Sequence, residues 1–230
     1  MLSAVTGSLT EPRYGNLTPT LGKQPLRLPS IINPEFFQRQ LANVEALPQL
    51  SILAIAVGIF TGAVILVFRI TVDYVLAVWI LPGGPESFEE LALAERFALP
   101  LIGAALLGLF LSRFAASERR VGVVHVMERL SRHQGHLPAK NALVQFFGGI
   151  LALISGQSGG REGPAVHLGA ASASLMGQAL NLPNNSIRVL VACGTAAAIA
   201  GSFNTPLAGV IFAMEVVMME YTLGSFIPVI

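Results

Sequence analysis

The sequence predicts an all-α membrane protein, built as a bundle of tilted, short and re-entrant helices. Hydrophobic residues make up 53% of the 230-residue chain and charged residues only 12%, whereas soluble domains carry about 25% charged residues. The charges are concentrated outside long apolar runs, which is typical of multi-pass membrane proteins. Glycine and proline interrupt the later apolar runs, and such breaks indicate helices that start or stop within the bilayer.

Composition also argues against other classes of protein. The sequence has no basic patch with interleaved aromatic residues, so nucleic-acid binding has no support. Cys193 is the single cysteine; it cannot form an internal disulfide and has no metal-ligating neighbours in sequence. We therefore expect neither a metal nor a cofactor.

The N-terminal part is polar and rich in proline. Residues 1–33 are expected to form a flexible cytoplasmic tail, because they offer little apolar surface to bury. Asn33 and Pro34 resemble a helix N-cap followed by proline at the first helical position. Residues 34–47 are expected to form an amphipathic helix on the membrane surface, and residues 48–230 the membrane half-domain.

Two apolar spans are predicted at residues 50–81 and 97–114. The first is longer than the ~20 residues that cross a bilayer, so it must tilt or overrun the membrane. Arg69 and Asp73 lie four residues apart near its end and are expected to pair.

The distribution of basic residues predicts the orientation. Lysine and arginine are concentrated in the tail and in residues 113–140, whereas the loop 82–96 contains only Arg96. By the positive-inside rule, the N-terminus is cytoplasmic and the loop lies outside, in a plasma (inner) membrane.

The later apolar segments are predicted to be short. Residues 121–130 are expected to form a brief helix at the interface. Four further segments of about 13 to 17 residues are expected at 142–154, 164–180, 185–200 and 206–221. All are shorter than a full span, which favours a transporter fold with discontinuous helices.

The stretch Ser155–Pro164 (SGQSGGREGP) is the central feature of the sequence. Non-helical backbone survives at membrane depth only where protein or a water-filled cavity surrounds it. We expect a half-helix whose first helical residue is Pro164. Its free N–H groups and positive dipole end favour an anion.

The same stretch literally satisfies the G-x-S-x-G pattern of serine hydrolases, with Ser158 as the nucleophile. The nucleophile elbow needs a strand-turn-helix that the sequence lacks. An intramembrane protease would need a later histidine, and none follows His167. An intramembrane serine hydrolase therefore stays a distant alternative.

Two motifs together resemble the CLC family of chloride channels and chloride/proton antiporters. Residues 160–164 match the motif G-[RK]-E-G-P, and residues 203–215 resemble F-N-x-P-L-A-G-x-x-F-x-x-E in the expected order and spacing. The resemblance covers about residues 45–230, the first of two inverted halves. It implies an all-α, homodimeric, multi-pass membrane protein that carries chloride or a similar anion and is not an enzyme.

The resemblance also implies roles for individual residues. Glu162 is identified as the gating glutamate, whose carboxylate competes with the anion. The expected anion cradle consists of Gly160, Arg161, Gly163, Pro164, Ala165 and Val166. The second motif supplies residues expected to be structural: Asn204, Pro206, Gly209, Phe212 and Glu215. For Glu215, a role at a helix end or in a subunit contact is supported at least as well as a role in ion handling.

The sequence departs from the family pattern at two positions. Val121 stands where the family has a serine at the central anion site, and Val216 stands where the antiporters have a proton-transfer glutamate. The second half of the fold is also absent from these residues, so we expect it as a further partner. A non-conducting remnant or assembly subunit is therefore the alternative function.

Local alternatives remain for the ionisable residues. Glu162 could pair with Arg161 or cap the helix that follows it. His167 is expected to be packed or hydrogen-bonded within a helix. The other three histidines, His125, His133 and His136, are expected to be solvated.

Overall fold

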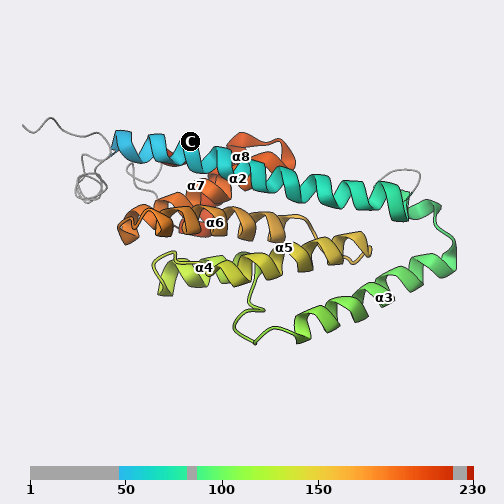
Figure 1. Ribbon diagram of the computed structural model, residues 1–230. Helices are drawn as coiled ribbons and strands as arrows, with labels where there is room; N and C mark the ends of the chain where they lie inside the picture. The colour runs from blue at the N-terminus through green and yellow to red at the C-terminus, as the bar shows by residue number, and fades with distance from the viewer. Residues whose placement is uncertain (1–46, 82–86, 220–226) are drawn as a thin grey trace, which may run out of the picture. The chain divides into compact units, whose positions relative to one another are not determined.

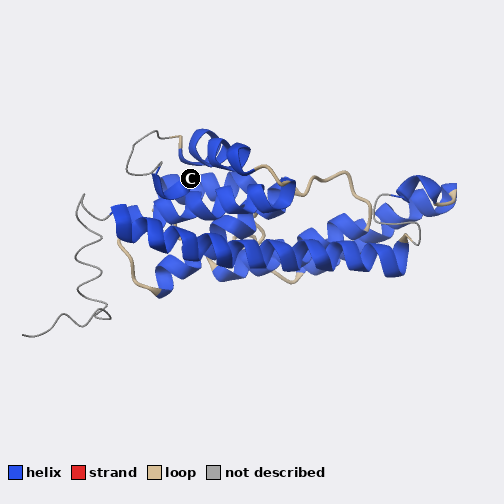
Figure 2. Cartoon of the chain, turned by 90° about the horizontal axis from the view of Figure 1, so that it is seen from above, coloured by secondary structure: helices blue, strands red, loops and turns tan. Residues whose placement is uncertain are grey.

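The computed structural model describes residues 47–81, 87–219 and 227–230, and these residues form helices and connecting turns with no strand among them (Figures 1 and 2). The tail predicted at 1–33 lies outside the described residues. So does the surface helix predicted at 34–47, apart from Leu47. The all-α prediction is confirmed for the part of the chain that the structure describes.

The first span is one long helix. α2 runs over Leu47–Val75 and continues as a π-helical segment, η2, over Leu76–Ile80. One side of α2 is buried at Val57, Ile65 and Val72, whereas apolar side chains on the other sides, such as Ile59, are exposed. An exposed apolar face on so long a helix fits contact with lipid.

The second span starts four residues earlier than predicted. After the 3₁₀ turn η3 (Ser87–Glu90), helix α3 occupies Leu93–Ser112. The Glu95 carboxylate accepts a hydrogen bond from the Ala92 N–H at 3.1 Å, which satisfies one of the free donors at this helix start. The prediction missed this start because it followed hydrophobicity, and hydrophobicity does not register a polar cap.

Two short helices follow. α4 covers Gly122–Arg132, as the prediction of a brief helix required, and α5 covers Ala139–Ile154. Asn141 of α5 donates hydrogen bonds to the carbonyls of Ser117 and Arg120, at 2.9 and 2.8 Å. These bonds fasten the segment before α4 to the start of α5.

The centre of the fold is the pair formed by α6 (Glu162–Ala179) and α7 (Asn184–Phe203). Each helix has a glycine at the crossing, Gly169 on α6 and Gly194 on α7. A Cβ on either glycine would overlap the other's carbonyl oxygen. The two backbones are therefore in direct contact, as small residues allow in membrane helices.

The length predicted for α7 was wrong. The helix has 20 residues instead of the 16 predicted, which is enough to cross a membrane. α6, at 18 residues, also exceeds its predicted length slightly. α7 continues through the exposed Gly201 to Phe203, because a single glycine costs a helix only about 1 kcal/mol. The turn comes at Asn204, whose φ of 55° is left-handed.

The last helix begins with proline, as predicted. α8 runs over Pro206–Phe212 with the proline in its first turn, and continues as the π-helical segment η4 (Ala213–Met218). A Cβ on Gly209 would lie 2.5 Å from the carbonyl oxygen of Ala196 on α7, so this position also requires glycine. The predicted end at residue 221 lies outside the described residues.

α6 is surrounded by other helices. It packs against α7, α2, α4 and α5, and its residues 165–174 are all buried. Most of them are small: alanine, serine and glycine dominate the helix. This packing holds the N-terminal end of α6, which contains the predicted site, in a fixed position.

The α6–α7 crossing gives a first prediction. Gly169→Val should destabilise the protein by about 2–3 kcal/mol, because the side chain meets a neighbouring backbone that cannot yield. The measurement is thermal unfolding in detergent, monitored as the loss of the monodisperse elution peak.

Gly62→Val is the matched control for this substitution. Gly62 lies in the apolar helix α2, and a Cβ there would meet nothing within 4 Å. Equal loss of stability in the two variants would show that the crossing does not depend on glycine.

Candidate functional site

The site begins with a tight turn after α5. The Ser155 hydroxyl donates to the Leu151 carbonyl at 2.8 Å and ends the helix. Gly156 has a φ of +68°, and a Cβ there would lie 2.9 Å from the ring of Phe88. Only glycine fits both the backbone conformation and the space. The chain then continues through Gly159 and Gly160 to the start of α6.

The structure corrects the predicted helix start. The first residue of α6 is Glu162, with Arg161 at the N-cap, so Pro164 is the third helical residue and not the first. Proline is tolerated there because the first turn of a helix has no acceptors for its N–H groups. The N–H groups of Glu162 and Gly163 therefore have no acceptor within the helix.

The Glu162 side chain is exposed and folds back along the turn. A Cβ on Gly160 would overlap Oε2 of Glu162, so the carboxylate lies directly over that glycine. By contrast, a Cβ on Gly163 would meet nothing within 4 Å, so space remains beside the start of the helix. The carboxylate thus occupies the concave side of the Gly160–Glu162 turn.

Arg161 points away from Glu162. Its guanidinium forms an ion pair with Asp73 of α2 at 3.2 Å, and Asp73 also pairs with Arg69 at 3.6 Å. The predicted Arg69–Asp73 pair is therefore confirmed. The alternative in which Arg161 pairs with Glu162 is not what the structure shows. The pair with Asp73 ties the turn to the first span.

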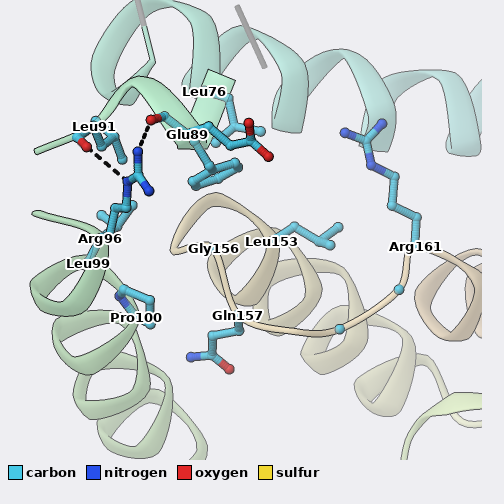
Figure 3. A pocket seen from close by; sticks show the side chains of 13 residues that line it. Leu76, Glu89, Leu91, Arg96, Leu99, Pro100, Leu153, Gly156, Gln157 and Arg161 are labelled. Atoms are coloured by element: carbon cyan, nitrogen blue, oxygen red, sulfur yellow. Dashed lines mark hydrogen bonds between the residues drawn. The ribbon is translucent and has the colours of Figure 1, made fainter. Parts of the chain in front are cut away.

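A cavity of about 580 Å³ lies on one side of the turn, and we refer to it as the loop cavity (Figure 3). Figure 3 shows Gly156 and Gln157 on the turn, with the Arg161 side chain extending toward α2. Arg96 of α3 is fixed by hydrogen bonds to the carbonyls of Leu91 and Glu89. Glu162 is not among the residues that line this cavity.

A second cavity, of about 260 Å³, is lined mainly by α3 and α5 beside the starts of α4 and α6, and we call it the junction cavity. Val121, the N-cap residue of α4, lines it together with Gly160 and Pro164 from the start of α6. Gln145 of α5 is the one polar side chain among its lining residues. The structure therefore brings Val121, the position matched to the central anion site, next to Gly160 and Pro164 of the predicted anion cradle.

The other predicted cradle residues lie deeper. Ala165 and Val166 are 1% and 0% exposed. The Ala165 N–H is hydrogen-bonded to the Arg161 carbonyl at 3.0 Å. Of the predicted cradle residues, Gly160 and Gly163 are the two at the turn whose backbone is accessible.

The residues of the second motif occupy positions that suit structural roles. Asn204 makes the left-handed turn and Pro206 starts α8, while Gly209 packs on α7. Phe212 packs against the hydrophobic core, and Glu215 is exposed on η4. None of these five residues lines the loop cavity or the junction cavity.

Sequence reasoning missed a buried pair of histidines. His125 of α4 was expected to be solvated, but it is only 5% exposed. Its Nδ1 lies 3.1 Å from Nε2 of the fully buried His167 on α6. The prediction that His167 is hydrogen-bonded within the fold is confirmed. The missed signal was the apolar face of α4, where Val126 and Leu130 are buried beside His125.

The sequence profile of the family described as "Voltage gated chloride channel" matches residues 103–230, which is more than half of the chain. The chain belongs to this family. It is 34% identical over 160 residues to a ClcB-like chloride channel protein of Ralstonia nicotianae, covering 66% of this chain and 37% of that protein. It is 29% identical over 187 residues to the H(+)/Cl(-) exchange transporter ClcA of Yersinia pseudotuberculosis, covering 80% of this chain and 39% of the transporter.

A solved structure supports the same assignment. The crystal structure of a CLC-type fluoride/proton antiporter superposes with a TM-score of 0.62 at 28% identity, over 81% of this chain and 46% of the antiporter chain. The resemblance to the CLC family and the CLC-like all-α fold are thereby confirmed. The chain spans less than half the length of each of these relatives.

The turn itself gives a second prediction. Gly156→Ala should lower the free energy of unfolding by about 1–2 kcal/mol, because alanine must adopt a left-handed conformation against the Phe88 ring. Thermal unfolding in detergent measures the change.

Gly159→Ala in the same turn is the control, since a Cβ there meets nothing within 4 Å. We expect it to change stability by no more than about 0.5 kcal/mol. If both substitutions cost the same, the special conformation of Gly156 has no energetic role.

Proposed function

We propose that this chain forms part of a chloride pathway across a membrane, in a CLC-type channel or transporter gated by Glu162. The observation that supports this most directly is the position of the Glu162 carboxylate. It lies over Gly160 in the turn that leads into α6, whose first N–H groups have no acceptor within the helix. A small anion would be attracted to the same position.

The proposed gate works by competition. A helix N-terminus attracts negative charge, and a carboxylate there is stabilised by about 0.3–1 kcal/mol, or ~2 kcal/mol when partly buried. Chloride can enter when it displaces the carboxylate or when the carboxylate is protonated and loses its charge. Both events release the side chain from the turn.

One helix terminus is too weak to hold an anion by itself, because removing a charge from water costs far more than one terminus returns. The junction cavity relieves part of this difficulty. Val121 at the start of α4, and Gly160 and Pro164 at the start of α6, line it, so an anion there would lie near two helix N-termini. The side-chain amide of Gln145 adds a hydrogen-bond donor.

Arg161 has a supporting role in this scheme. Because its guanidinium pairs with Asp73, its charge holds the turn in place and does not bind the anion directly. The backbone of Gly160 and Gly163 forms the cradle, with Pro164 shaping the first turn of α6. Ala165 and Val166 anchor that turn in the core.

The remaining features of the proposal follow from the family. The chain lies in a plasma (inner) membrane with its N-terminus in the cytoplasm and works in a homodimer, together with a second inverted half of the fold. It needs no cofactor, and the transported anion is its ligand. The alternative is a non-conducting remnant or assembly subunit. Val121, which lacks a hydroxyl donor in the junction cavity, favours this alternative.

The hydrolase alternative gains no support from the site. Ser158 lies in an exposed bend. The last histidine in the sequence, His167, is buried in α6 with its Nε2 next to His125. A serine nucleophile needs a histidine within hydrogen-bond reach, and here the imidazole of His167 has another partner.

The gate gives a third prediction, tested by chloride efflux from liposomes that contain this chain together with the second half of the fold. At pH 7.5, Glu162→Gln should raise the efflux rate about two- to fivefold, because it removes ~0.3–1 kcal/mol of competition from the exposed carboxylate.

Glu90→Gln is the control for loss of a carboxylate, because Glu90 is exposed on η3, an element separate from the start of α6. The gate assignment fails if Glu162→Gln and Glu90→Gln give the same efflux at every pH. Absence of efflux from all three proteins would favour the non-conducting alternative.

A further inference from the structure

The buried histidine pair has no role in the proposed gate, yet it lies close to the junction cavity. The two rings join α4 to α6, with Nδ1 of His125 3.1 Å from Nε2 of His167 and ring centroids 5.3 Å apart. A separation of 3.1 Å between two ring nitrogens requires a proton between them, so one ring donates and the other accepts.

The pair is adjacent to the junction cavity along both helices. His125 comes four residues after Val121, and His167 comes three residues after Pro164. At 1.5 Å per residue, these separations are roughly 6 Å and 4.5 Å along the helix axes. Val121 and Pro164 both line the cavity, so a charge on the pair would be close to an anion held there.

The pair can also receive a proton from solution. His125 is one of the residues that line a polar pocket of about 290 Å³, between α4, the start of α5 and the segment before α4. When His125 takes up a proton on its outer nitrogen, its Nδ1–H still donates to His167. The added charge strengthens this bond, because charge-assisted hydrogen bonds are the stronger class. The protonated pair therefore stays joined.

The charged groups around the histidine pair affect how readily the pair binds a proton. In the polar pocket, Arg120 pairs with Glu128 at 3.1 Å and Lys140 pairs with Glu118 at 2.9 Å. His133 also lines the pocket. Arg129 donates to the His136 carbonyl, which leaves its positive charge in place and opposes a further proton.

The elements packed against α4 and α6 contribute few other charges. Glu215 lies on η4, and Arg188 is the charged residue of α7; on α2 the charges are Arg69 and Asp73, and α6 itself has only Glu162 besides His167. Burial and Arg129 both disfavour the charged pair, so it takes up its proton only in acid.

We propose that the His125–His167 pair is a proton-binding site whose positive charge stabilises an anion in the junction cavity. The added proton binds Nε2, the outer nitrogen of His125, while the Nδ1–H of His125 donates to Nε2 of His167. Nδ1 of His167 is buried without a hydrogen-bond partner among the described residues, and in the protonated pair it carries a hydrogen. A buried donor without an acceptor adds to the attraction for an anion.

Proton and anion therefore bind with positive coupling. By linkage, acid tightens anion binding, and a bound anion raises the affinity of the pair for its proton by the same factor. Val216 removes the glutamate that antiporters use for proton transfer, so this pair would give the chain a separate response to pH. The inference rests on the proposed anion site.

Isothermal titration of chloride tests the pair in the Glu162→Gln background, where the gate no longer titrates. The dissociation constant should fall about five- to tenfold between pH 7.5 and pH 5.0, within the usual range of coupling between sites. Adding His125→Gln or His167→Gln should abolish the shift, because glutamine keeps a hydrogen bond but cannot take up the proton. Adding His136→Gln, which does not line the pocket, should preserve it.

The outcomes separate the two claims. No chloride binding at either pH in the Glu162→Gln protein would refute the proposed anion site. Chloride binding with the same affinity at both pH values would overturn the histidine pair alone, as would an undiminished shift in the His167→Gln variant. If the glutamine variants do not fold, nitrogen NMR of the two rings gives the answer. The pair must gain one proton between pH 7.5 and 5.0, and rings that remain neutral would refute it.

Discussion

The constraint on which the rest of this structure depends is that backbone N–H groups inside a membrane need partners, because lipid offers none. The break between α5 and α6 leaves the first N–H groups of α6 without helical acceptors. The Glu162 carboxylate lies over the turn beside them. Much of the fold serves to hold this end in place: Gly169 and Gly194 bring α6 and α7 into backbone contact, and Asp73 fixes Arg161.

The sequence predicted those parts of the fold that depend on local features. Glycines, a proline and a charged pair located the break at residues 155–164, and the apolar runs located the helices. The rest depended on features that hydrophobicity does not register. A single glycine does not stop α7, which continues through the exposed Gly201, and α3 begins earlier because Glu95 caps it. His125 is buried because His167, 42 residues away, supplies its partner.

The junction cavity changes the account of Val121. In sequence it is a position where a hydroxyl donor is lost. In the structure it is the N-cap of α4 and faces the same cavity as Gly160. A helix terminus attracts an anion through its backbone, which a valine side chain does not remove.

The central claim is that an anion binds where α4 and α6 begin. Crystals of the Glu162→Gln protein grown in bromide, with diffraction data collected at the bromine absorption edge, test it most directly. The account predicts an anomalous peak in the junction cavity, between Val121 and the Gly160–Gly163 turn. Well-ordered density for both helix starts, with no peak between them at saturating bromide, would contradict it.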